Sequence, residues 1–537
     1  MLPLGLTPVA PLWAADDLSG ADKLRALYSA EFRFTDEGVP IVPVAIAESV
    51  EDVIVSAEGG LRLLPEGDEG PELASPEPFR ITAVHTTAAR LRFWPVVYRA
   101  KAGPGVGAEA ARRVAGLAAR GLVAKVFEQG TLFAVAGEVL DRREILVGVA
   151  SAPSYDAAEK ALEKLRASEP SVSGIYTEMV ERPHGDLVAT GRKTAVRLRN
   201  EGALWVAASG DRPLRVEGRK AGGVAFQGSY HGRLLFTVGR KGMLVVVNAV
   251  PENQLLAGLV PAEIFASAPD EALKAQAIAA RGELLAKIGA RHIGEPFRLC
   301  AETHCQVYAG AARETPRTTA AVEATRGEVL FEADGKELVD TVYSANCGGH
   351  TEHNENAWAD TPAHSALRGH LDGPAAAQSP FAGGITSATV ERFLTDPPPT
   401  YCGRASTQGG TDRFRWTVTR TAAELDRLLT GHGLGKLRAI EVMERGVSGR
   451  ARAVNIVGST KSEVIRGELR IRQTFGNLRS SLFVVDVVAG AATFRGGGFG
   501  HGVGLCQTGS IGMAEAHKSY REILQHYYQG SVLRKLW

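Results

Sequence analysis

The chain has 537 residues, of which 45% are hydrophobic and 23% charged, so it is expected to fold into several globular domains. Its 61 Lys and Arg residues nearly balance its 60 Asp and Glu residues, which argues against an overall electrostatic attraction to nucleic acid. No run approaches the roughly 20 apolar residues that a membrane-spanning helix needs, and five cysteines are too few for a disulfide scaffold.

The N-terminal part of the chain combines a tail with two β-rich regions. Residues 1–39 are predicted to be a tail that begins with an apolar stretch ending in small residues, as at the end of a signal peptide. Because this stretch lacks a positive segment and contains several prolines, a signal remnant and a loose tail both remain open. Short β-branched runs that stop at Gly and Pro predict β-rich regions over 40–92 and 179–250. Residues 40–64 and 203–237 could be two pieces of one β unit.

The segment 93–178, between these regions, changes to an alternation of strands and helices. The predicted order is βαββαβ. It begins with a strand at Val96–Ala100 and a helix at Gly107–Gly121, followed by a strand pair of Leu122–Glu128 and Thr131–Ala136 around a turn at Gln129-Gly130. A strand at Glu144–Val149 and a helix at Asp156–Arg166 come next. This order resembles the SPOR module, a small domain that binds glycan strands stripped of their peptides. A generic α+β module would give the same order.

An acidic residue precedes a strong helix signal after residue 250. Ser267 is predicted to cap a helix that has Pro269 in its first turn. One face of that helix carries small and apolar residues and is expected to be buried, namely Leu273, Ala277, Ala280 and Leu284. Glu263 lies just upstream, between Val260-Pro261 and Ile264-Phe265. In apolar surroundings the charged carboxylate loses solvation, so the pKa of Glu263 should rise and the group could donate a proton near neutral pH. The local pattern by itself favours a glutamate that faces solvent.

Three soft ligands occur within six residues, at Cys300, His304 and Cys305, and His292 lies eight positions before the first of them. Thiolates and imidazoles at this density suit tetrahedral zinc. A Cys300–Cys305 disulfide is the alternative in an oxidising compartment.

Two later segments are framed by glycines. Ser344–Glu352 (SANCGGHTE) follows a predicted strand, and its paired glycines would bring backbone N–H groups close to a ligand. Gly496–Gln507 (GGGFGHGVGLCQ) has a spacing that matches neither common phosphate-binding loop, and its histidine between glycines favours a role in a site. Cys347 could pair with Cys402, and a zinc role for Cys347 or His350 is also open.

Several motifs, in the order typical of the family, make residues 240–535 resemble the SpoIID/LytB family. The run LLAGLVPAEIFASAPDEALKAQAIAARGELL resembles the family signature, in which a Pro-x-Glu precedes an Ala-rich helix. Gln306–Gly310 is similar to the family's QVYxG segment, and Ser344–Thr351 to its SxxGGxT block, followed here by Trp358. The closing GHGVGLCQTGSIGMA differs from the family's motif mildly, with Ser510 where Ala is usual, and SYREILQHYYQGSVL is similar to the final helix.

This resemblance implies a multi-domain α+β protein, β-rich in its N-terminal regions, with a catalytic domain over 251–537. It implies that Glu263 is the catalytic acid of a lytic transglycosylase. Such an enzyme cleaves the bond between N-acetylmuramic acid (MurNAc) and N-acetylglucosamine (GlcNAc) in peptide-stripped peptidoglycan and leaves 1,6-anhydro-MurNAc ends. Some members hold zinc near the active site with a Cys/His cluster, and others lack it. We expect substrate contacts from Gln306, Ser344, Gly348, Gly349, Thr351, His501 and Gln507, and zinc ligands from His292, Cys300, His304 and Cys305.

Other functions remain open at this stage. A hydrolysing glycosidase needs a second carboxylate, for which Glu302, Glu352 and Glu355 are candidates. The main alternative is a non-catalytic glycan-binding protein that enhances a cell-wall amidase, and the third is a metal-dependent hydrolase. The expected partners are peptidoglycan strands and a cell-wall amidase, with no nucleic acid, and the expected location is extracytoplasmic.

Overall fold

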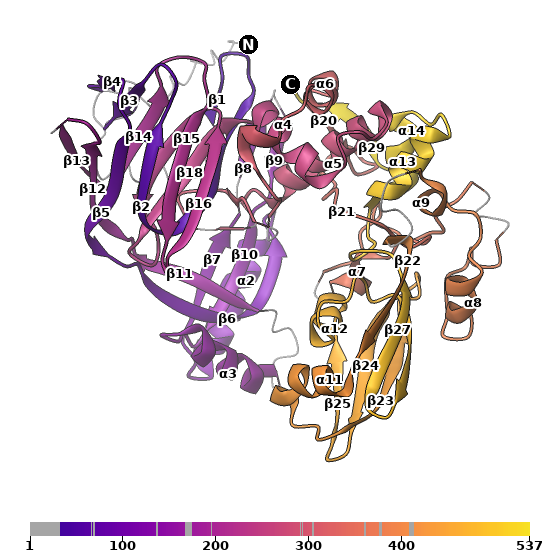
Figure 1. Ribbon diagram of the computed structural model, residues 1–537. Helices are drawn as coiled ribbons and strands as arrows, with labels where there is room; N and C mark the ends of the chain where they lie inside the picture. The colour runs from indigo at the N-terminus through magenta and orange to yellow at the C-terminus, as the bar shows by residue number, and fades with distance from the viewer. Residues whose placement is uncertain are drawn as a thin grey trace, which may run out of the picture.

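The computed structural model has a β-rich α+β fold with several bodies (Figure 1). It describes residues 33–537 except 66, 68–69, 131, 136–137, 167–173, 195, 290, 293, 303–304, 359–360, 375–378 and 407–412. The predicted α+β class is therefore confirmed. Most of the N-terminal tail, with its possible signal remnant, lies outside the described residues.

A 13-stranded sheet forms the body at the left of Figure 1. Its main path runs β13 (Arg197–Glu201), β12 (His184–Gly191), β5 (Phe79–Thr87), β2 (Pro40–Ser56), β18 (Leu244–Pro251), β17 (Arg233–Val238), β14 (Ala203–Ala208), β3 (Leu61–Leu64) and β4 (Leu73–Ser75). Off this path lie β1 (Arg33–Phe34), β15 (Leu214–Lys220), β16 (Val224–Tyr230) and β19 (Leu299–Cys300). The sheet thus joins the two β-rich regions that flank the segment 93–178.

The segment between those regions folds as a small module below the large sheet (Figure 1). Four antiparallel strands lie in the order β11 (Ile175–Glu181), β6 (Arg90–Lys101), β10 (Glu144–Val149) and β7 (Ala124–Gln129), accompanied by α2 (Val106–Ala119) and α3 (Tyr155–Arg166). The predicted hairpin is wrong, because β7 pairs with β10 while β8 (Leu132–Val135) pairs with β9 (Glu138–Asp141). Pairing in the four-stranded sheet buries Phe127, which the hairpin would not do.

A group of helices lies beside the large sheet, at the upper centre and right of Figure 1. They comprise α4 (Glu252–Glu263), α5 (Asp270–Lys287), α6 (Pro316–Ala324), α13 (Gln507–Glu515) and α14 (Tyr520–Tyr527), with the strand pair β20 (Glu328–Phe331) and β29 (Val532–Lys535). The face predicted for α5 is confirmed, since Leu273 and its three partners are completely buried. The predicted cap is wrong, because α5 begins at Asp270 with Pro269 as its N-cap residue and without a side-chain cap.

A separate arm, at the lower right of Figure 1, is built from residues between 352 and 504. One three-stranded sheet has the order β22 (Arg415–Arg420), β27 (Ala491–Gly497) and β26 (Phe483–Val488). The other has the order β23 (Leu437–Arg445), β24 (Ala451–Gly458) and β25 (Ser462–Arg466). Two helices accompany the sheets, α11 (Ala422–Leu428) and α12 (Glu468–Thr474). The short elements α7 (Asn354–Ala357), α8 (Val390–Thr395) and α9 (Tyr401–Arg404) connect the arm to the helices. The two sheets share one hydrophobic core.

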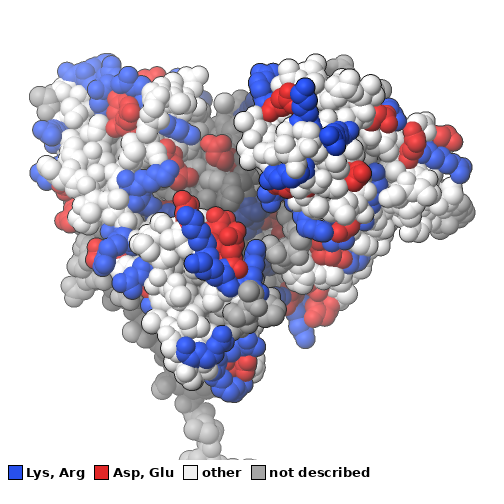
Figure 2. Space-filling view, turned by 90° about the horizontal axis from the view of Figure 1, so that it is seen from below, with Lys and Arg blue, Asp and Glu red and all other residues white. Residues whose placement is uncertain are grey.

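The surface carries both signs of charge. On the face shown in Figure 2, Lys and Arg side chains are interspersed with Asp and Glu side chains over every lobe. This mixture matches the near balance of charges in the sequence, and the face shown offers no large area of a single sign to a polyanion. None of the described helices combines the length and the apolar character needed to cross a bilayer.

Candidate functional site

Glu263 is the last residue of α4, a helix that the sequence pattern did not reveal. Pro261 lies inside the final turn, where it removes a backbone donor, and the helix ends at Glu263 because Ile264 is extended. The start of α4 is held by a completely buried ion pair, in which Arg281 Nε of α5 donates to Glu252 Oε1 at 2.7 Å. Because both helices are fixed to each other in this way, the position of Glu263 is set by the core.

The Glu263 side chain lines a pocket of about 210 Å³. The walls come from the end of α4, from the short helix η2 (Gly310–Arg313), from the arm and from the start of α13. They consist of Pro261, Ala262, Glu263, Ile264, Phe265, Arg313, Arg413, Gln507, Thr508 and Ile511. Among these described lining residues, Glu263 is the one carboxylic acid.

Burial raises the pKa of Glu263, as the sequence predicted. A hydrogen bond from the Val307 N–H to Oε1, at 3.2 Å, opposes this shift, and the charge of Glu283 adds to it. The Glu263 side chain is half-buried, so it combines a raised pKa with access to the pocket. A carboxylic acid of this kind can hold a proton and deliver it to a bound substrate.

A polar network supports this position from behind. Gln306 is buried, and its Nε2 donates to Glu283 Oε2 at 2.9 Å and to the Tyr343 hydroxyl at 3.3 Å. Lys287 forms an ion pair with Glu283 and also donates to the Cys305 carbonyl. Glu283 is therefore neutralised by Lys287, so that its charge only partly reaches Glu263. Gln306, expected as a substrate contact, contacts this network and does not line the pocket.

The two glycine-framed segments lie side by side. Strand β21 (Tyr343–Ser344) pairs in parallel with β28 (Leu505–Cys506), and Asn346 exchanges backbone hydrogen bonds with Phe499. Thr508 Oγ1 donates to the Ala345 carbonyl at 2.8 Å. The pairing places Gln507 and Thr508, the first residues of α13, in the pocket beside Glu263.

The remaining predicted contacts are not among the residues that line the pocket. Ser344 is buried within β21, and Gly348 and Gly349 have positive φ values of 77° and 100° in the turn that follows. Thr351 is buried, with its hydroxyl accepting from the His370 N–H at 2.9 Å. His501 stacks near Trp358 with ring centroids 4.9 Å apart, and burial lowers its pKa to about 3, so the imidazole is neutral.

Arg413 connects the pocket to the glycine-rich segment and was missed by sequence reasoning. Its guanidinium lies 5.1 Å from the ring centre of Phe265 and 5.7 Å from that of Phe499. Phe265, Phe499 and Trp358 are each more than a third exposed. Arg413 lies in a polar, glycine-rich stretch of sequence, and no motif there marks it as a site residue. Phe265 lies two positions after Glu263, so its closeness to Glu263 in the sequence could have identified it.

The three candidate second acids serve other purposes. Glu352 is buried and accepts hydrogen bonds from Ser448 Oγ at 2.7 Å and from several backbone N–H groups, so it holds a turn of the arm. Glu355 pairs with Arg368. Glu302 is exposed and pairs with Lys220 at 3.6 Å. None of the three lines the pocket.

The predicted Cys/His cluster is brought together. His292, Cys300 and Cys305 offer ligand atoms that lie within 4.8 Å of one another, and His292 Nε2 lies 3.2 Å from Cys305 Sγ. His304 lies outside the described residues. The five cysteines are thiols in this structure, so the donor set of two thiols and an imidazole fits a zinc ion. His350 directs its Nδ1 to the Thr351 carbonyl at 2.7 Å and is not part of this cluster.

Known proteins share the regions that build this site. Residues 240–331 match the family of Stage II sporulation protein (SpoIID), and residues 352–504 match a domain of unknown function (DUF8618). An uncharacterized protein of Brachyspira hyodysenteriae is 29% identical over 306 residues, which cover 56% of this chain and 71% of that protein. The "Amidase enhancer" of Bacillus subtilis is 28% identical over 52% of this chain but only 40% of its own length. "Stage II sporulation protein D" of Bacillus amyloliquefaciens is 27% identical over 53% of this chain and 74% of that protein. The region that holds Glu263 and the α4–α5 helix pair is therefore similar to the Stage II sporulation protein (SpoIID) family.

Proposed function

We propose that the protein acts in the cell wall as a lytic transglycosylase, which cleaves the MurNAc–GlcNAc bond of peptide-stripped peptidoglycan. The observation that carries the proposal is the pocket with one carboxylic acid, Glu263, whose pKa is raised by burial. A hydrolase with two carboxylates would need a second acid across the pocket, and the described lining residues offer arginines, Gln507 and Thr508 instead.

The proposed reaction uses Glu263 twice. The protonated carboxyl donates its proton to the glycosidic oxygen as the bond from that oxygen to C1 of MurNAc breaks. The C6 hydroxyl oxygen of the same sugar then bonds to C1, and its proton returns to the Glu263 carboxylate. The products are a GlcNAc 4-hydroxyl and a 1,6-anhydro-MurNAc end, with no water consumed and the acid restored for the next cycle.

The pocket walls supply groups that would orient the sugars. The Gln507 amide and the Thr508 hydroxyl can exchange hydrogen bonds with hydroxyl and acetamido groups. The exposed rings of Phe265 and Phe499, with Arg413 between them, can pack against apolar sugar faces. Donors fixed by secondary structure need little reorganisation when charge develops on the substrate.

The proposed partner, location and metal rest on the similar proteins and on the Cys/His cluster. The similarity to a protein named "Amidase enhancer" supports a cell-wall amidase as a partner, and a wall substrate implies an extracytoplasmic location. Zinc would be held by His292, Cys300 and Cys305, with His304 as the expected fourth ligand, in a structural role. The SPOR-like module would bind the same denuded strands.

The test is a product analysis by mass spectrometry on denuded and on intact glycan. We expect 1,6-anhydro ends from denuded glycan with the wild type and with Glu217→Gln, an exposed glutamate on β15, and none with Glu263→Gln. Equal products from Glu263→Gln would contradict the role of this acid. Glycan binding without products, together with stimulation of an amidase, would favour a non-catalytic enhancer. Reducing ends that disappear with a chelator would favour a metal-dependent hydrolase.

A further inference from the structure

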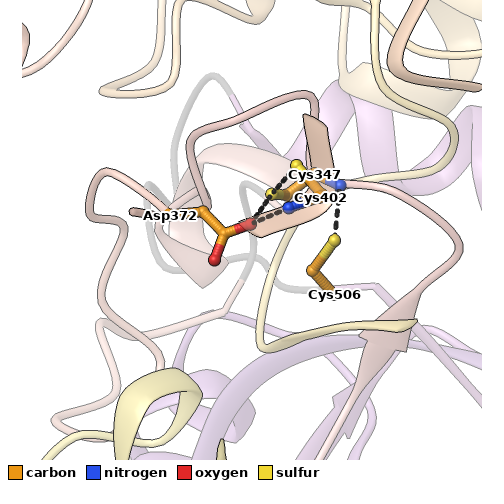
Figure 3. A group of neighbouring side chains, drawn as sticks. All are labelled: Cys347, Asp372, Cys402 and Cys506. Atoms are coloured by element: carbon orange, nitrogen blue, oxygen red, sulfur yellow. Dashed lines mark hydrogen bonds between the residues drawn. The ribbon is translucent and has the colours of Figure 1, made fainter. Parts of the chain in front are cut away.

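Four buried ligand groups outside the pocket converge from distant parts of the sequence. Cys347 follows β21, Asp372 lies in a loop, Cys402 is in α9, and Cys506 ends β28. Their sulfur and carboxylate atoms all lie within 4.8 Å of one another, and each residue is at most 2% exposed. Figure 3 shows the three thiols and the carboxylate directed toward a common point.

The distances fit ligands of one metal ion better than a disulfide. Cys347 Sγ and Cys402 Sγ lie 3.6 Å apart, whereas a disulfide requires about 2.05 Å. Two thiolates at about 2.3 Å from a tetrahedral zinc ion lie about 3.8 Å from each other. Asp372 Oδ2 lies 3.4 Å from Cys347 Sγ, on the side of the thiols.

The surrounding groups hold the carboxylate in place for such a role. Asp372 Oδ1 accepts from the Tyr527 hydroxyl at 2.9 Å and contacts His526 Nε2 at 3.1 Å, which leaves Oδ2 facing the thiols. Outer partners that fix a metal-binding carboxylate in this way are typical of metal sites.

The sulfur atoms are also positioned by the backbone. Cys506 Sγ accepts from the Cys347 N–H at 3.1 Å and from the Gly509 N–H at 3.2 Å, donors that stabilise a thiolate. The half-buried Arg415 guanidinium donates to the Gly348 carbonyl at 3.0 Å, one residue from Cys347, and supplies a positive charge near Cys347 and Cys402.

We propose that Cys347, Cys402, Cys506 and Asp372 bind one zinc ion, at a site separate from the His292 cluster. Three thiolates and a carboxylate complete a tetrahedral shell and leave no open position, so the metal is structural. The site lies at the N-terminus of α13, where Cys506 directly precedes the pocket residues Gln507 and Thr508. The ion thereby fastens that wall of the pocket to the Cys347 turn and to α9.

The stoichiometry of bound zinc tests this site in the full chain. The Cys300→Ser/Cys305→Ser protein, which lacks the thiols of the other cluster, is reconstituted with zinc under reducing conditions and measured by elemental analysis. We expect one zinc ion per chain. Asp372→Asn or Cys402→Ser in that background should lower the zinc content at least tenfold, whereas Asp211→Asn, an exposed control, should leave it unchanged. Absence of zinc, or zinc retained in Asp372→Asn and Cys402→Ser, would overturn the proposal.

A second measurement uses the wild-type protein and needs no variant. X-ray absorption at the zinc edge, on wild-type protein loaded with zinc, reports the sulfur ligands of both sites together. We expect three sulfurs in one site and two in the other, an average of two and a half per ion at two ions per chain. One ion per chain with two sulfurs, or a Cys347–Cys402 disulfide in peptides mapped without reductant, would overturn the proposal.

Discussion

Glu263 acquires its chemistry from three neighbours and from the helix that ends at it. The Val307 N–H fixes one carboxylate oxygen, Glu283 disfavours the charged form, and Pro261 lines the pocket beside the side chain. Burial is the largest influence, and it raises the pKa. The protonation state of Glu263 therefore links the activity of the protein to its stability.

Replacement of the acid should remove the chemistry and leave the fold intact. Glu263→Gln keeps the size of the side chain but cannot donate a carboxyl proton, so turnover of denuded glycan should fall by about 10²–10⁴-fold. Steady-state rates and circular dichroism of the same preparation check both parts. A variant with more than half of wild-type turnover would exclude Glu263 as the acid.

The same substitution makes a prediction about stability against pH. Because the folded pKa of Glu263 lies above its ordinary value of 4.5, the folded chain binds more protons than the unfolded chain between the two pKa values. The wild type therefore loses stability as pH rises through this interval, whereas Glu263→Gln does not. Thermal unfolding should show the variant to be the more stable protein at neutral pH, with the difference shrinking below about pH 4.5. A difference that is constant over pH would contradict the raised pKa.

Arg413 should contribute to sugar binding through the two rings it contacts. Arg413→Ala removes both ring contacts, each worth roughly 0.5–2 kcal/mol, and leaves the rings less fixed. We expect a higher KM for glycan with little change in kcat. Arg404→Ala, an exposed arginine of α9, is the matched control. An unchanged KM in Arg413→Ala would remove this residue from the binding surface.

At the scale of elements, the α4–α5 pair is what makes the site rigid. Helix α5 is buried on nearly every side, and α4 is fixed to it by the pair of Arg281 and Glu252. Arg281 Nη1 also donates to the Thr325 carbonyl at 2.8 Å, which ties in the end of α6. The helix pair therefore carries Glu263 on a scaffold that does not depend on a loop.

Breaking this ion pair should destabilise the domain. Arg281→Met leaves the Glu252 carboxylate buried without its partner, which costs about 3–5 kcal/mol in comparable cases. Denaturant unfolding should show this loss, and the double variant Glu252→Gln/Arg281→Met should recover part of it because no uncompensated charge remains. If the single and the double variants were equally unstable, the loss would arise from packing rather than from charge.

The sequence predicted some elements of this region and missed others for identifiable reasons. The periodic face of α5 was visible because small and apolar residues recur every three or four positions. Helix α4 was hidden because Pro261 and Gly258 lie within it, and both normally argue against a helix. The hairpin predicted within the SPOR-like module failed because strand partners far apart in sequence outcompeted the local turn.

At the scale of the whole molecule, the pocket forms where four distant parts of the chain meet. Glu263 and Gln507 could be predicted from motifs, but Arg313, Arg413 and Thr508 could not, because only the fold brings them together. Gly348, Gly349, Thr351 and His501 occur in the same motifs but do not line the pocket, and their predicted contact with substrate stays a prediction. Motif residues can thus serve the chemistry or the shape of a site, and local sequence does not distinguish the two.

The central claim is that Glu263 drives cleavage in which the substrate's own hydroxyl, and not water, attacks the sugar. Digestion of denuded glycan in heavy-oxygen water measures this directly, because each hydrolysed bond would acquire a labelled oxygen. The account predicts unlabelled 1,6-anhydro ends with the wild type and no cleavage with Glu263→Gln. Labelled reducing ends, or the same unlabelled products from both proteins, would contradict it.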